Sequence, residues 1–212
     1  MVNIRLLDIQ VAQMLQSRLL PDLYYHSPAH TRDVLRSALR IGREEGLSPL
    51  ELELLGAAAL LHDTGFTVAY ADHEWHSCAI ARILLPKHGA DESFIERVCD
   101  LIQATRIPQQ PTDLLSEILC DADLDYLGRD DFEEISNHLY RELLAYRIVN
   151  DSYEWDQIQV HFLENHSYHR PLMRELREWK KREHLEIIRE RLDNRPEEEE
   201  DDETQNGNLE DT

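Results

Sequence analysis

The stretch LLGAAALLHDTGF, residues 54–66, is apolar almost throughout until it reaches His62 and Asp63. A helix that is apolar on every side is typical of a central helix that other helices surround. An ionised carboxylate at the end of such a helix needs a partner, because an unpaired charge in an apolar interior costs several kcal/mol or more. The stretch therefore predicts a buried helix whose last residues meet other polar side chains.

Apolar residues recur at helical spacing over most of the 212-residue chain, and alternation over the length of a strand is hard to find. Ser27-Pro28 and Ser48-Pro49 each offer an N-cap followed by proline at the first helical position. We expect an all-α protein of about nine helices. One lies near the N-terminus, two begin at those prolines, and the others are expected over residues 73–85, 92–105, 113–127, 131–148, 153–167 and 172–192.

The charge of the chain is strongly negative and unevenly spread. The formal net charge is −21, and nine acidic residues with no Lys or Arg follow Arg195. That last segment has too few apolar residues to offset the entropy of ordering, so we expect a single helical domain over 1–195 and a disordered acidic tail over 196–212. An acidic surface repels phosphate backbones, which argues against polymeric nucleic acid as a partner.

Cysteine usage and the absence of long apolar runs bear on the compartment. Cys78, Cys99 and Cys120 form no CxxC pair and fall in expected helices, as reduced buried thiols do. No apolar run approaches the roughly 20 residues that span a bilayer. We expect a cytoplasmic protein with no membrane contact, and leave open whether it is a monomer or a homodimer.

Two further polar residues fall on inward helical faces. His30 shares a face with Val34, Ala38 and Ile41, at steps of four, four and three residues. Asp121 follows Ile118 by three residues and also faces the core, and Asp125 comes one turn later. Two histidines and two carboxylates at core-facing or helix-end positions could satisfy one another around a divalent metal ion.

Each of these residues also has a purely structural interpretation. A lone His on an apolar face, such as His30, is more often a hydrogen-bonded core residue than a metal ligand. The dipeptide His62-Asp63 alone could arise by chance, and Asp121 alone could cap a helix or pair with an Arg. The metal hypothesis depends on their joint occurrence, in this order, on separate helices.

The motifs that carry these residues resemble a known superfamily. YHSPAH at 25–30, HD at 62–63 and a later inward Asp are similar to the HD-domain metal-dependent phosphohydrolases, over roughly residues 20–195. The stretches ADHEWHSCAIARILL, LIQATRIPQQP and ILCDADLDYLGRDDF resemble a bacterial branch of predicted HD phosphohydrolases whose substrates are generally unassigned. The resemblance implies a single-domain HD-type helical bundle.

The resemblance also implies a ligand set and a reaction. His30, His62, Asp63 and Asp121 match the four metal-ligand positions. Imidazole with carboxylate suits Mn, Fe, Co, Ni or Zn, with Mg a weaker binder, and we favour Mn or Fe. Such an ion activates water for attack on a small phosphomonoester or phosphodiester, with a nucleotide as the expected substrate.

Two residues are expected to take part in catalysis directly. Asp63 could bind the metal through one oxygen and hold the attacking water with the other. His26 resembles the His that some relatives use as proton donor to the leaving group, although it could equally be a loop His ahead of an N-cap.

Further polar residues are candidates for binding the substrate or supporting the ligands. His73 matches the first extra His of binuclear relatives, but Thr105 stands where those relatives have the second, which favours one metal ion. His73 and Glu74 are then left to bind substrate or water, or to cap their helix. Arg106 could grip phosphate, or could be a surface Arg at a helix end. Asp125 completes the set of supporting residues.

Two other classes of function stay open on sequence alone. One is a metal- or nucleotide-binding HD regulatory module without catalysis, which the missing second-metal His and the acidic tail motivate. The other is a helical interaction protein in which these His and Asp residues are structural.

Overall fold

The computed structural model describes residues 2–194, and the expected tail over 196–212 lies outside them. The described residues form α-helices and short 3-10 helices without a β-strand, which confirms the all-α prediction and its nine helices. The α-helices are α1 (Ile4–Arg18), α2 (Pro28–Glu44), α3 (Pro49–Leu61), α4 (His73–Leu84), α5 (Glu92–Ala104), α6 (Leu114–Asp123), α7 (Phe132–Ala145), α8 (Ser152–Asn165) and α9 (Pro171–Asp193). The 3-10 helices are η1 (Thr64–Thr67), η2 (Leu85–His88) and η3 (Asp125–Gly128).

The two predicted helix starts are capped as expected. The Ser27 side chain accepts a hydrogen bond from the His30 backbone N–H, and Pro28 is the first residue of α2. Ser48 and Glu51 form a capping box at the start of α3, in which each side chain bonds the other's backbone N–H. These caps fix where α2 and α3 begin, and hence where their later residues point.

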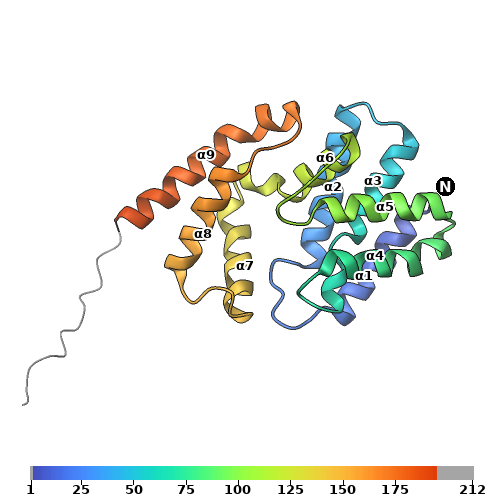
Figure 1. The fold of residues 1–212 in the computed structure, drawn as a ribbon, viewed down its shortest axis with the longest axis horizontal. Coiled ribbons are helices and arrows are strands. Elements are labelled where there is room, and N and C mark those ends of the chain that lie inside the picture. Colours follow the sequence, from blue (N-terminus) through green and yellow to red (C-terminus); the bar gives the residue numbers. More distant parts are fainter. Residues whose placement is uncertain (1, 195–212) are drawn as a thin grey trace, which may run out of the picture.

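Helix α3 is the central element of the larger core. Its last seven residues, 55–61, are all buried, and α1, α2 and α5 pack around it (Figure 1). Leu55, Leu60 and Leu61 are at most 1% exposed, and full burial of each leucine contributes about 1.5–3 kcal/mol. The prediction of a surrounded helix at 54–61 is therefore confirmed, and His62 follows it as the C-cap residue.

A smaller core lies between α7, α8, α9 and η3, on the left of Figure 1. Phe132, Leu163, Leu185 and Ile188 belong to it, and Tyr25, from the segment before α2, joins them. Asp63, which follows α3, and residues of α7 and α8 line a common cavity, so the polar residues lie between the two cores.

The expected helix over 113–127 is interrupted. α6 ends at Asp123, Leu124 leaves helical geometry with φ −104° and ψ 15°, and the chain continues as η3. The break places Asp123 at the C-terminal end of α6, where its side chain turns toward α2 and α3.

None of the helices in the described part of the chain is long and apolar enough to cross a membrane. The three cysteines are free and buried, as expected from their spacing.

Candidate metal centre

Four side chains from three helices converge at the C-terminal end of α3. His30 Nε2 lies 3.2 Å from Asp63 Oδ2 and 3.2 Å from Asp123 Oδ1. His62 Nε2 lies 3.1 Å and 3.4 Å from the same two oxygens. The side chains are well buried, with exposed fractions from 1% for His62 to 15% for Asp123. The structure thus brings His30, His62 and Asp63 together, as the sequence predicted.

The HDTGF loop is fixed against α4 by its backbone. The Gly65 N–H donates to Ser77 Oγ at 2.8 Å, and the Ser77 hydroxyl donates to the His62 carbonyl at 2.5 Å. A Cβ on Gly65 would lie 1.9 Å from the carbonyl oxygen of His73. Only glycine allows this approach of the loop to α4, which holds His62 and Asp63 in place.

The polar atoms at the centre of the cluster are unsatisfied by the protein. His30 Nε2, His62 Nε2 and Asp63 Oδ2 are buried without a hydrogen-bond partner of acceptable geometry. His62 Nδ1 pairs with the Ala59 carbonyl at 2.9 Å, which sets the tautomer and leaves Nε2 as an electron-pair donor. Buried orphan atoms of this kind call for an explanation, and a bound ion is one.

The arrangement fits a divalent metal ion. Among the described residues, His30, His62 and Asp123 form a cluster whose ligand atoms all lie within 4.8 Å of one another, and Asp63 adjoins it. Adjacent ligands around a six-coordinate ion with bonds of about 2.1 Å are about 3.0 Å apart, close to the 3.1–3.4 Å between these nitrogens and oxygens. Two imidazoles and two carboxylates suit Mn, Fe, Co, Ni or Zn.

Without an ion, the cluster holds its charges by mutual pairing. Burial alone lowers the pKa of His30, but the adjacent carboxylates of Asp123 and Asp63 raise that pKa to about 9. Burial raises the pKa of Asp63 and of Asp123, yet the neighbouring histidines hold both well below the usual range. A metal ion would take the place of the protons on the two histidines.

The structure does not bring Asp121, the fourth ligand predicted from sequence, to the cluster; Asp123 lies there in its place. Asp121 does face the core and is fully buried, but its oxygens accept hydrogen bonds from the backbone N–H groups of His169 and Arg170 at 2.7 and 2.8 Å. Side chains two residues apart on an α-helix are separated by a rotation of about 200° around the helix axis, so they lie on nearly opposite sides. Asp121 therefore ties α6 to the start of α9, on the side opposite the ligands.

His26 lies beside the cluster and is held by a residue that the sequence did not single out. Its Nδ1 is in close contact with Glu142 Oε1, and Glu142 is fully buried on α7. The other Glu142 oxygen accepts from the backbone N–H groups of Tyr25 and His26 at 2.9 and 3.1 Å. Burial raises the pKa of Glu142, but His26 and these backbone bonds hold it below its usual value. His26 is therefore a positioned side chain, in contrast to a free loop histidine.

His73 and Glu74 lie at the rim of the cluster. His73 Nε2 is 3.5 Å from Asp63 Oδ1 and 3.5 Å from Glu74 Oε1. Phe66 stacks on His73 and also on His26, with ring centroids 4.0 Å apart in each pair. Thr105 is buried nearby, but its hydroxyl donates to the Ile102 carbonyl of its own helix.

Two of the predicted supporting residues lie elsewhere. Arg106 is on the surface, 63% exposed, where it pairs with Asp72 at 3.1 Å. The Asp125 carboxylate accepts from Ser37 Oγ and Arg177 Nε, both at 2.7 Å. Asp125 joins α2 to α9 and lies outside the cluster of His30, His62, Asp63 and Asp123, because the chain has left α6 and entered η3 at this point.

A cavity of about 360 Å³ opens from the cluster toward the smaller core. Its polar end is formed by His26, Asp63, His73, Glu74, Thr105 and Asp123. The rest of its wall is mostly apolar and comes largely from η3, α7 and α8: Leu124, Tyr126, Leu127, Phe132, Leu139, Leu143, Trp155, Ile158, Phe162 and Leu163. Ligand sites commonly combine an apolar wall with a few convergent polar groups in this way.

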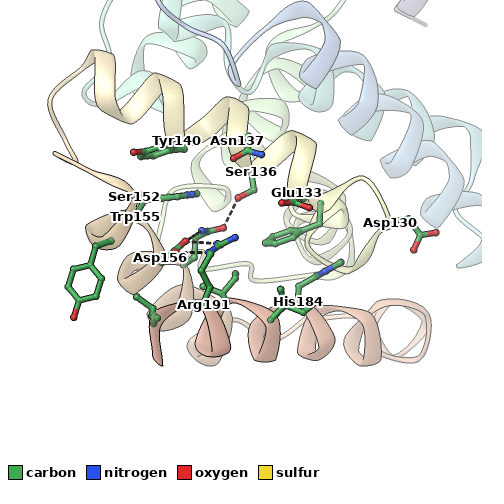
Figure 2. A pocket seen from close by; sticks show the side chains of 16 residues that line it. Asp130, Glu133, Ser136, Asn137, Tyr140, Ser152, Trp155, Asp156, His184 and Arg191 are labelled. Atoms are coloured by element: carbon green, nitrogen blue, oxygen red, sulfur yellow. Dashed lines mark hydrogen bonds and ion pairs between the residues drawn. The ribbon is translucent and has the colours of Figure 1, made fainter. Parts of the chain in front are cut away.

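A second cavity, of about 470 Å³, lies between α7, α8 and α9 (Figure 2). Its carboxylate Asp156 is already paired with both Nε and Nη2 of Arg191. It shares four lining residues with the first cavity: Phe132, Ser136, Trp155 and Gln159. The larger cavity contains none of the clustered ligands, so the candidate reaction site is the smaller one.

Comparisons with known proteins agree with this geometry. Residues 29–125 match the HD domain family model, a range that includes His30, His62, Asp63 and Asp123. No curated protein matches the chain. A solved structure described as a predicted HD superfamily hydrolase, from an uncultured Thermotogales bacterium, is similar in fold. It is 23% identical, covers 87% of this chain and 91% of its own, and has a TM-score of 0.58. The chain therefore contains an HD domain over residues 29–125, and its fold is similar to that of the solved structure.

Proposed function

We propose that this protein is a metal-dependent phosphohydrolase that cleaves a small phosphate ester, with a nucleotide as the favoured substrate. The observation that carries the proposal is the convergence of buried, unsatisfied ligand atoms of His30, His62 and Asp63 with Asp123 at the polar end of a cavity. The HD domain match and the hydrolase named in the similar solved structure support it.

His30, His62, Asp63 and Asp123 would hold one divalent ion, with manganese or iron favoured. When bound, such an ion supplies a water nucleophile at neutral pH and stabilises negative charge on the phosphoryl oxygens. Thr105 offers no imidazole for a second ion, which supports a mononuclear site. Asp63 has its second oxygen directed toward His73, so it can orient the attacking water by accepting a hydrogen bond from it.

His26 is the proposed proton donor to the leaving group. Its Nδ1 faces the Glu142 carboxylate, so Nε2 is the nitrogen left to face the cavity and the leaving group. In the reaction, the oxygen of water forms a bond to phosphorus and the bond from phosphorus to the ester oxygen breaks. His26 gives its proton to that oxygen, and one proton of the attacking water passes to the solvent, from which His26 is reprotonated, so the products of a monoester are an alcohol and inorganic phosphate.

The proposal is tested by metal analysis and hydrolysis with the purified protein. We expect about one transition-metal ion per chain and release of phosphate from nucleoside monophosphates or a generic aryl ester. His62→Ala and Asp63→Ala should abolish release, whereas His88→Ala is a matched control, because His88 contacts Gln10 away from the cavity. Activity that survives both substitutions refutes the proposal. Metal and nucleotide binding without turnover would identify a regulatory module instead.

A further inference from the structure

The cavity beside the metal centre has an uneven distribution of charge. Asp63, Glu74 and Asp123 line its polar end, and none of the described residues along its wall is Lys or Arg. Coulomb interactions are strong in such a site because low dielectric surrounds it. A phosphate group held at the ligands would be matched by the ion, but any further phosphate would meet carboxylates and apolar surface without a counter-charge.

The far end of the cavity has one prominent polar feature, the side chain of Gln159. This residue is 6% exposed and lies among aromatic side chains on α8 and η3. Its Oε1 accepts from the Ser136 hydroxyl at 2.6 Å, and its Nε2 donates to Asp156 Oδ1 at 3.1 Å. An amide has two N–H donors and two acceptor lone pairs, so one of each is left for a ligand.

Asp156 and Arg191, on the side away from this cavity, fix the orientation of the Gln159 side chain. Asp156 is held by a two-point ion pair from Arg191 on α9, and this pair faces the neighbouring cavity, where Figure 2 shows Ser136, Asp156 and Arg191. The chain of contacts from Arg191 through Asp156 fixes which atom of the amide is the donor. A buried amide held from two sides is suited to distinguish ligands by hydrogen bonding.

We propose that the far end of this cavity is a subsite for the leaving group. It selects phosphate monoesters whose leaving group is uncharged and carries an apolar ring with a hydrogen-bonding edge, and Gln159 determines that selection. Tyr126, Trp155 and Phe162 supply ring surfaces for stacking. The inference rests on the proposed function, and it excludes esters with further phosphates, such as nucleoside triphosphates.

The first test compares esters on the manganese-loaded full chain. The 5′-monophosphates of adenosine and thymidine should have kcat/KM at least roughly tenfold above glycerol phosphate and ATP. Equal values for ATP and a nucleoside monophosphate would overturn the subsite. Absence of phosphate release from every ester would instead refute the proposed hydrolase function.

The second test uses Gln159→Met, which keeps the length of the side chain and removes its hydrogen bonds. KM for a nucleoside monophosphate should rise roughly tenfold while phenyl phosphate, which has no hydrogen-bonding edge on its ring, is unaffected. Arg191→Met, at a partly exposed site, should produce a smaller change of the same kind. Arg189→Met is the matched control, because Arg189 pairs with Glu164 and Glu186 at the surface. Equal changes for both esters would overturn the role of Gln159.

A binding measurement tests the subsite without catalysis. Calorimetric titration of metal-free protein with adenosine or thymidine, the leaving groups alone, should show binding that Gln159→Met weakens roughly tenfold. Nucleoside affinity that is identical in the wild type and in Gln159→Met overturns the proposal, whether or not the protein hydrolyses any ester.

Discussion

Asp123 and Asp121 lie two residues apart on α6, and replacing each with Asn should separate metal binding from folding. Asp123 faces the imidazoles of His30 and His62, whereas Asp121 accepts hydrogen bonds from two backbone N–H groups near the start of α9. Asn keeps the size of each side chain, so only the charge and the donor pattern change. We expect Asp123→Asn to impair metal binding and Asp121→Asn to impair stability.

The two substitutions should change different quantities: Asp123→Asn the increase of Tm caused by metal, and Asp121→Asn the stability of the fold itself. An ion at a hundred times its dissociation constant stabilises the folded state by about 2.7 kcal/mol, which raises Tm by roughly 5–10 °C in a chain of this length. Loss of a carboxylate ligand should remove most of that increase. In Asp121→Asn, an amide N–H would face a backbone donor, which costs about 1–3 kcal/mol with or without metal. Burial raises the pKa of Asp121 to about 7, so the comparison belongs at pH 8, where the carboxylate is ionised.

The assay is thermal unfolding with manganese and with a chelator, and the measured quantity is the difference between the two for each protein. Wild type and Asp121→Asn should show the same increase of Tm with manganese, and Asp121→Asn should start from a lower Tm. Asp123→Asn should show little increase. If Asp121→Asn loses the increase and Asp123→Asn keeps it, the assignment of the fourth ligand is refuted.

Three further predictions follow from the structure. Glu142→Gln should lower kcat roughly a hundredfold on phenyl phosphate and much less on p-nitrophenyl phosphate, because the better leaving group needs less proton donation from His26; equal losses on both esters would contradict this role. Gly65→Ala should lower the free energy of unfolding, measured in urea, by about 3 kcal/mol, because its Cβ would meet the His73 carbonyl; wild-type stability would show that the loop tolerates the contact. Burial lowers the pKa of His166 to about 3, so this His stays neutral when folded but is protonated below its ordinary pKa when unfolded. The free energy of unfolding therefore falls as the pH drops below 6.5, because only the unfolded state binds this proton, and the loss is about 2 kcal/mol at pH 5. His166→Asn should lose that much less stability between pH 8 and pH 5, and an unchanged pH dependence would contradict the buried neutral state.

The sequence predicted the fold and three members of the cluster because these follow from local patterns. The apolar run at 54–61 predicts a surrounded helix, and Ser27 and Ser48 mark where α2 and α3 begin. Helical periodicity then correctly places His30 on the inner face of α2. Such signals need no knowledge of how distant segments meet.

The fourth member of the cluster, Asp123, could not be predicted in the same way. Periodicity correctly identified Asp121 as a core-facing residue. Helix α6 is buried on more than one side, however, so a residue of α6 can face the core without facing the cluster. The segment CDADLD at 120–125 offers an acid at every second position. Choosing among the three requires knowing that α6 ends at Asp123 and which segment covers Asp121.

Glu142 and Gln159 were missed for different reasons. Glu142 follows Ile135 and Leu139 at steps of four and three, so periodicity placed a carboxylate on the inner face of α7 and could have marked it. Gln159 carries no such signal, because a glutamine on an amphipathic helix is common at the surface. Its role depends on Asp156 and Arg191, which meet only when α8 packs on α9.

The most direct test of the metal centre is anomalous diffraction from crystals of the manganese-loaded protein, measured above and below the manganese edge. We predict one strong peak per chain, within about 2.3 Å of His30 Nε2, His62 Nε2 and oxygens of Asp63 and Asp123. A peak at another site, with these four side chains still paired to one another, would contradict the assignment.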